Sequence, residues 1–474
     1  MGPALAVWGP LLENGPGFGG VMKKILAVVA VLLALAVLLE ASYSLIFEKS
    51  FFRSLLYGQS VPAELPRLES GSKPTVAQNT VSEEKIPSDD STTEDVRLQV
   101  AAVRPSAGDY DLVDQRGGYQ ALPEESRELY ADLLRASYSV TVKENKKGFY
   151  STDTVVLEGR QLEEELLQET ISALRNDNPQ LFWIANVYSY TVTDGGTAVQ
   201  LYSRIPADQI NLMVAELNGA VRKIISGMPQ DLTEFDREAY LFEQVASNCS
   251  FDQDAAEDAS KWKPYTVYGA LVEGRAVCEG YSRAMQLLLS YAGMQCRLAD
   301  GYGEGQMHMW NLVRVDGDWY HLDATWNDGD SMVRYNYFNV TDSVIRLDHE
   351  IYTEDLPACG ADRWNYFKAR GIRISGLDET SVRSAAEQLA QAGERKEASA
   401  VFYFEESVDY DEALSKIFHN EPFLLMEMIR EANRSLEDCQ ISTKNIIYTE
   451  ARASRGVTLR LNYDSKEDKE DVNG

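Results

Sequence analysis

Cys278 is the residue of this chain whose surroundings best suit covalent chemistry. It lies in the stretch GRAVCEGYSRAMQLLL, shortly after Gly274 and where apolar residues begin to recur at helical spacing. The apolar face of this expected helix consists of Tyr281, Met285, Leu288, Leu289 and Ala292. At a helix start, unpaired N–H groups and the positive end of the dipole favour the thiolate, which is the reactive form of cysteine. The same N–H groups can bind a developing oxyanion, so we expect Cys278 to be a nucleophile.

A histidine and a carboxylate follow in the segment MHMWNLVRVDGDWYHLDATWND. Its Asp-Gly pair predicts a two-residue turn between two antiparallel strands. If Val315 pairs with Asp318, His308 and Asp323 share one face of the hairpin as diagonal neighbours, about 7–8 Å apart at the backbone. His308 can then act as the base for the thiol and Asp323 can orient its imidazole, which is the layout of a catalytic triad.

His321 is the competing base, because the same register puts it on that face, opposite Leu312. It lies two residues nearer the turn. We expect a structural role for His321 and favour His308, whose end of the strand lies near Thr325 and Asp323.

The motifs C-E-G-Y, H-x-W-N and W-Y-x-x-D-x-T-W, in this order between residues 232 and 339, resemble the bacterial transglutaminase-like superfamily. The resemblance implies an α+β fold with a papain-like core, in which the helix bearing the cysteine packs on an antiparallel sheet. It also implies the roles of nucleophile for Cys278, general base for His308 and orienting carboxylate for Asp323. Met309 is bulkier than the residue often found after the histidine in this family.

The function that the resemblance implies is a cysteine-dependent acyl transfer on peptide or amide bonds through a thioester, as in a peptidase or a transamidase. The alternative is a catalytically inactive transglutaminase-like scaffold or binding protein of the cell envelope. The complete Cys278, His308 and Asp323 set favours the enzyme, although a fold alone does not fix a function.

No cofactor or metal is expected. The cysteines form no CxxC pair, which disfavours a zinc site, and their odd number, five, leaves at least one thiol outside any disulfide. The glycines at 301–305 open no helix and so do not form a phosphate loop, and the acidic turn at 327–330 lacks the alternating ligands of a calcium loop. Cys296 is expected to be buried and inert. Trp310 and Trp326 are expected to pack in the core, with a role in the cleft wall left open.

Six segments are expected along the chain. Residues 1–48 are a signal peptide or membrane anchor, 49–121 a disordered acidic linker, 122–230 an N-terminal αβ domain, 231–348 the catalytic core, 349–376 a connection and 377–474 a C-terminal αβ domain. The fold class is therefore α+β, with two smaller αβ domains flanking the core.

Export is predicted by Lys23 and Lys24, which precede fifteen uninterrupted apolar residues at 25–39. An uncleaved signal would leave residues 25–47 as an anchor of about 20 residues, and the two lysines would stay cytoplasmic. The folded part is therefore expected outside the cell or at its surface, held to the membrane by this anchor.

The net charge of −29 would repel phosphate backbones, so nucleic acid is not expected as a partner. The expected partner is a protein or peptide substrate, with the cell envelope as one source of it.

Overall fold

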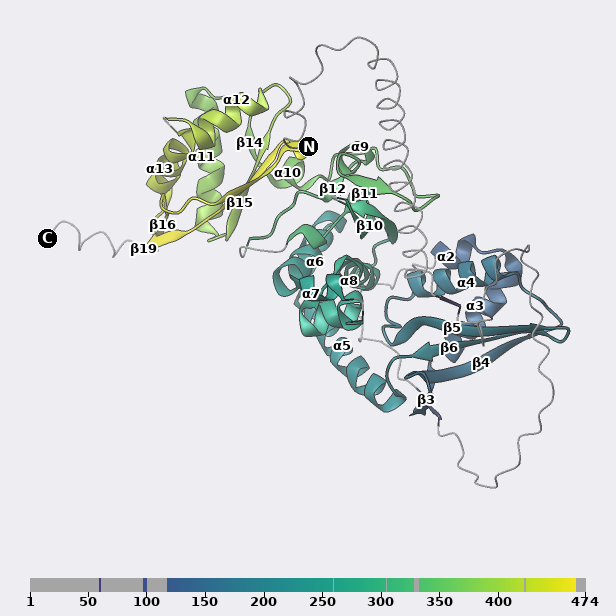
Figure 1. The fold of residues 1–474 in the computed structure, drawn as a ribbon. Coiled ribbons are helices and arrows are strands. Elements are labelled where there is room, and N and C mark those ends of the chain that lie inside the picture. The colour runs from purple at the N-terminus through teal and green to yellow at the C-terminus, as the bar shows by residue number, and fades with distance from the viewer. Residues whose placement is uncertain are drawn as a thin grey trace, which may run out of the picture. The chain divides into compact units, whose positions relative to one another are not determined.

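A computed structural model of the chain describes residues 117–465 except 259, 304, 328–331 and 422, together with two short strands, β1 (Gln59–Ser60) and β2 (Arg97–Gln99) (Figure 1). Helices and mainly antiparallel sheets alternate, which fits the α+β class. The expected signal or anchor at 1–48 lies outside the described residues, as does most of the linker at 49–121. The last five residues of that linker form α2 (Gly117–Ala121). Within the described part of the chain, no helix is both long and apolar enough to cross a membrane.

The first sheet contains the strand order β5-β6-β4-β3-β2. Its further strands are β3 (Ser139–Glu144), β4 (Tyr150–Glu158), β5 (Ile184–Thr193) and β6 (Gly196–Ser203), and its helices are α3 (Glu124–Ala136), α4 (Glu164–Asp177) and α5 (Ala207–Gly227). The β5–β6 hairpin turns at the Asp-Gly-Gly sequence, and Gly196 there has a φ of 131° that a side chain would disfavour.

The central sheet carries the candidate site. Its strands are β9 (Cys296–Gly303), β10 (Gln306–Val315), β11 (Asp318–Leu322), β12 (Phe338–Val340) and β13 (His349–Ile351), all antiparallel in the order β12-β11-β10-β9-β13. Two helices, α6 (Glu234–Asn248) and α8 (Cys278–Tyr291), pack together, and α8 lies against β9 and β10. Almost every residue of α8 is buried, including the whole apolar face expected from the sequence.

Short elements connect α6, α8 and the strands. They are β7 (Ser250–Phe251), α7 (Gln253–Glu257), the 3-10 helix η1 (Lys263–Tyr265), the π-helix η2 (Gly269–Glu273), β8 (Arg275–Ala276), the 3-10 helix η3 (Thr325–Asn327) and α9 (Asp342–Ile345).

The β10–β11 hairpin has the register that the sequence predicts. Val315 pairs with Asp318, and the ladder continues to Asn311 and Leu322. Asp316 and Gly317 have φ angles of 48° and 93°, the left-handed pair that a two-residue hairpin turn requires.

The third sheet has the order β14-β15-β18-β17, and a separate buried cluster joins this sheet to the helices of the same segment. Its elements are α10 (Tyr366–Arg370), β14 (Ile372–Ile374), α11 (Glu379–Glu394), β15 (Ser399–Phe404), α12 (Tyr410–Leu414), the π-helix η4 (Ser415–His419), α13 (Leu424–Ser435), β16 (Cys439–Ile441), β17 (Tyr448–Ala451), the 3-10 helix η5 (Arg452–Ser454), β18 (Gly456–Arg460) and β19 (Tyr463–Ser465). The strands β16 and β19 pair with each other.

The segment 349–376, expected to be a connection, contributes to the sheets on both sides of it. Its first residues form β13, an edge strand of the central sheet. Near its end, β14 pairs in parallel with β15 of the third sheet. The central sheet therefore extends past Asp348, which was the expected end of the core.

Candidate active site

Cys278 is the first residue of α8, as the sequence predicts. Val277 precedes it with extended backbone and offers no side-chain cap, so the N–H groups of the first turn have no capping side chain. The backbone N–H of Val277 donates to the carbonyl of Pro264 at 3.0 Å, which fixes the entry of the chain into the helix. All five cysteines lie in the described part of the chain, and Cys278 is the one that is not buried.

Polar contacts hold α8 against β10. The hydroxyl of Ser282, one turn after Cys278, donates to the carbonyl oxygen of Met309 at 2.8 Å. The amide of Asn311 donates to the carbonyl oxygen of Ser282 at 2.9 Å. These buried hydrogen bonds fix the helix that carries the thiol against the strand that carries His308.

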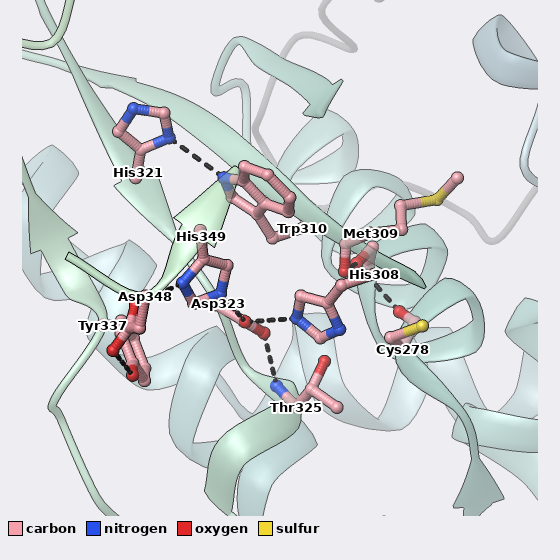
Figure 2. Close-up of polar contacts among 11 residues, drawn as sticks. Cys278, His308, Met309, Trp310, His321, Asp323, Thr325, Tyr337, Asp348 and His349 are labelled. Carbon is pink, nitrogen blue, oxygen red and sulfur yellow. Dashed lines mark hydrogen bonds and ion pairs between the residues drawn. The ribbon is translucent and has the colours of Figure 1, made fainter. Parts of the chain in front are cut away.

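His308 and Asp323 are in direct contact. Nε2 of His308 lies 2.6 Å from Oδ2 of Asp323, and both side chains are buried. Because an ionised carboxylate only accepts hydrogen bonds, Nε2 carries a proton. The other ring nitrogen, Nδ1, lies on the side of Cys278 (Figure 2). The structure thus brings together the three residues that the sequence singles out.

The charges of this group depend on one another. Burial alone would lower the pKa of His308, but the charge and hydrogen bond of Asp323, together with Cys278, raise it to about 10. Burial would raise the pKa of Asp323, yet the two histidines beside it hold that pKa well below its usual range. Asp323 and His308 therefore form a buried ion pair at neutral pH, with the positive charge facing the thiol.

A second histidine contacts the same carboxylate, and the sequence analysis missed it. Nε2 of His349, on β13, lies 3.4 Å from Oδ2 of Asp323, and its Nδ1 lies 2.6 Å from Oδ1 of Asp348 (Figure 2). No periodic pattern marks a three-residue edge strand, so the sequence offers only the histidine itself as a signal.

His321 is occupied elsewhere. Its Nδ1 accepts a hydrogen bond from the indole of Trp310 at 3.0 Å, and its Nε2 lies 2.9 Å from Oδ1 of Asp342. Burial lowers the pKa of His321, which agrees with a neutral ring that accepts at one nitrogen and donates at the other. This arrangement fits the structural role expected for His321, and it fixes Trp310 beside His308.

Two groups of side chains among the described residues are close enough to suggest a metal, namely His308 with Asp323 and His349, and His321 with Asp342 and Cys359. In both groups, the atoms that could bind a metal also contact one another. Nε2 of His308 and Nε2 of His349 face Asp323, and His321 faces Asp342 and the Trp310 indole. Hydrogen bonds alone account for these close contacts.

Trp326 and Thr325 complete the surroundings of His308. The Trp326 ring lies 5.3 Å from the His308 ring. The Trp326 indole N–H and the Thr325 hydroxyl are buried, and neither has a hydrogen-bond partner among the described residues. Cys296, by contrast, is buried on β9, and burial raises the pKa of its thiol, which suits the inert role expected for it.

Part of the chain is similar to known proteins. Residues 220–324 match the Transglutaminase-like superfamily. Kyphoscoliosis peptidase of Mus musculus is 23% identical over 146 residues, which are 28% of this chain and 21% of that protein. Kyphoscoliosis peptidase of Homo sapiens is 25% identical over 122 residues, which are 23% of this chain and 18% of that protein. The matched segment thus spans about a fifth of the length of these curated relatives.

Among solved structures, a crystal structure of a TGase aligns with a TM-score of 0.23 and 13% identity, over 37% of this chain and 51% of that chain. The family match covers Cys278, His308 and Asp323 but ends before His349. Residues 220–324 are thus similar to the transglutaminase-like superfamily, and the three candidate residues all lie within this matched segment.

Proposed function

We propose that this chain is a cysteine-dependent acyl-transfer enzyme acting on peptide or amide bonds, with Cys278 as nucleophile, His308 as general acid and base, and Asp323 as orienting carboxylate. The observation that carries the proposal is the 2.6 Å contact between His308 Nε2 and Asp323 Oδ2, which leaves Nδ1 facing the thiol at the start of α8. The match to the transglutaminase-like superfamily supports the same chemistry.

The reaction follows from these positions. The Cys278 thiolate attacks the amide carbonyl, and the first-turn N–H groups of α8 stabilise the oxyanion. The His308 imidazolium gives its proton to the leaving amine as the C–N bond breaks, which leaves a thioester and a neutral imidazole. His308 then takes a proton from water or from an amine as that acceptor attacks the thioester, and Cys278 leaves as the thiolate.

The test is alkylation of the full-length chain by a limiting dose of iodoacetamide near pH 6, read by intact mass and peptide mapping. An ordinary thiol, with a pKa of about 8.5, hardly reacts there, whereas a thiolate paired with an imidazolium reacts fast. We expect single labelling at Cys278 that slows at least tenfold in His308→Ala. The Cys278→Ala variant is the control for labelling elsewhere.

Slow labelling that is unchanged in His308→Ala would contradict the proposal and favour the alternative, an inactive scaffold or binding protein. If labelling is fast, peptide hydrolysis and the incorporation of an amine probe then separate a peptidase from a transamidase.

We also propose that the enzyme is exported and acts on protein or peptide substrates at the cell surface, tethered by residues 25–47. Two lysines followed by an uninterrupted apolar stretch support this proposal. The acidic segment that follows would give the folded part reach from the membrane.

A further inference from the structure

His349 contacts the proposed triad, and neither the sequence pattern nor the family match includes it. Its side chain has no exposed surface, and its Nε2 lies 3.4 Å from Asp323 Oδ2, the oxygen that also contacts His308. Asp323 Oδ1 accepts the backbone N–H of Thr325 at 2.9 Å. The buried carboxylate thus meets three N–H groups from three directions.

The contacts of His349 call for a donor at each ring nitrogen. One ring nitrogen faces Asp323, and the other lies 2.6 Å from Oδ1 of Asp348. Both partners are carboxylates, which only accept when ionised, so a ring nitrogen that bonds to either of them donates its N–H. Asp348 is in turn held by the hydroxyl of Tyr337, which donates to its Oδ2 at 2.6 Å.

The fold leaves His349 little freedom to move. Its ring lies 5.1 Å from the rings of both Trp310 and Tyr337. On the neighbouring strand it pairs with Gly303, where a Cβ atom would lie 3.1 Å from the His308 ring and 3.2 Å from Nε2 of His349. A side chain at position 303 would press on both imidazoles, so the absence of one lets the two rings share Asp323.

We infer that His349 is a positioning residue of the proposed triad, which holds Asp323 ionised and oriented toward His308 through its Nε2–H. The inference rests on the proposed function. The other ring nitrogen of His349 contacts Asp348, whose side chain is 37% exposed, so a chain of polar contacts runs from His308 through Asp323 and His349 outward to the surface.

The consequence is a dependence on pH. The titratable groups that face this pair are His308 on β10, His321 on β11, Asp348 and Tyr337. Loss of one N–H donor raises the pKa of a buried carboxylate, so Asp323 would take up a proton at higher pH. The imidazolium of His308 would then lose its counter-charge, and the reactive thiolate would be lost with it.

The test compares two variants of similar size in the full-length chain. In His349→Gln the amide reaches the place of Nε2 and still donates to Asp323, whereas in His349→Asn it reaches only the place of Nδ1 and the donor is lost. The rate of Cys278 alkylation by iodoacetamide is measured from about pH 3 to about pH 7. On the acid side of this profile, the alkylation rate falls as the pH is lowered. We expect the midpoint of this fall, the acid limb, to lie about one pH unit higher in His349→Asn and to stay in place in His349→Gln.

Several results would overturn the inference. Acid limbs of both variants that coincide with wild type would show that His349 does not act on Asp323, and equal shifts in both would show a packing role only. If His349→Asn does not fold, His349→Phe, which keeps an aromatic ring and has no donor, replaces it and should show the same shift. Slow labelling of wild type at every pH would instead contradict the proposed function itself.

Discussion

Glu238, on α6, is a carboxyl group without exposed surface. The amide of Asn339 donates to its Oε2 at 2.6 Å, and its Oε1 has no hydrogen-bond partner among the described residues. Burial raises the pKa of Glu238 to about 8 and outweighs the hydrogen bond. Glu238 is therefore neutral in the folded protein at neutral pH and ionised in the unfolded chain.

Stability should fall as pH rises because of this group. Below the unfolded pKa, near 4.5, both states hold the proton. Between that value and about 8 only the folded state holds it, so the free energy of unfolding falls across this window. We expect Glu238→Gln, relative to wild type, to gain stability from pH 5 to pH 8.5, on the order of a few kcal/mol.

Thermal and urea unfolding at the two pH values measure the effect. Glu387→Gln is the matched control, because Glu387 is an exposed carboxyl on α11. A difference between Glu238→Gln and wild type that stays constant with pH would contradict the assignment.

The sequence predicts the relative positions of residues that lie in one local element, such as a hairpin. The two-residue turn and the alternation of the hairpin placed His308 and Asp323 on one face, and the structure has that register. His349 could not be found in this way, because β13 reaches Asp323 only through its pairing with β9, a contact between distant parts of the chain. The catalytic role of Cys278 stays a prediction, since geometry alone does not measure reactivity.

At the scale of elements, the start of α8 is the most constrained part of the candidate site. Gly280 lies so close to Pro264 that a Cβ atom would stand 2.3 Å from its carbonyl oxygen. That carbonyl also accepts the N–H of Val277, just before the helix. The first turn of α8 can therefore lie where it does only with glycine at position 280.

Gly280→Ala should displace this first turn. We expect a loss of stability of about 1–3 kcal/mol from overpacking, together with slower alkylation of Cys278 near pH 6. Gly219→Ala, in α5, is the control, because no neighbouring atom lies within 4 Å of the added Cβ and alanine favours a helix by about 1 kcal/mol. Alkylation of Gly280→Ala at the wild-type rate would show that the nucleophile tolerates movement of the turn.

Elements with a clear period were the predictable ones. The helix that the recurrence of apolar residues after Cys278 predicts is α8. The three-residue strands β12 and β13 have no such period, because they are too short to alternate and are formed by pairing at the sheet edges.

At the scale of the whole molecule, the segment that matches the transglutaminase-like superfamily shares one cluster of buried side chains with the helices and strands that precede it. One cluster of buried side chains runs from Leu129 and Trp183 to Phe242 and Leu288. Arg283 of α8 donates to the carbonyl oxygen of Arg175 at 2.9 Å, so the end of α4 meets the helix that bears Cys278. The domain boundary expected between residues 230 and 231 stays a prediction. The buried cluster contains side chains from both sides of that boundary.

Export can be tested on the intact chain. A bacterial alkaline phosphatase joined after residue 474 folds only where its disulfides form, outside the cytoplasm. We expect phosphatase activity when the N-terminal segment is intact, and at least a tenfold loss of that activity when residues 22–47 are deleted. A second variant, in which glutamate replaces Lys23 and Lys24, keeps the apolar stretch. It should also lower phosphatase activity, because the positive charges orient the segment in the membrane. Activity that is independent of this segment would contradict export by it.

Burial of the other four cysteines affects how oxidation of Cys278 could be reversed. A thiolate at Cys278, as proposed, is the form that peroxide converts to a sulfenic acid. Such an acid is commonly rescued by a neighbouring resolving thiol, and Cys249, Cys296, Cys359 and Cys439 are all buried. Repair would therefore fall to small thiols from the surroundings, and without them the residue would advance to the irreversible sulfinic acid. Under the proposed chemistry and export, the local redox conditions would set how long Cys278 stays active.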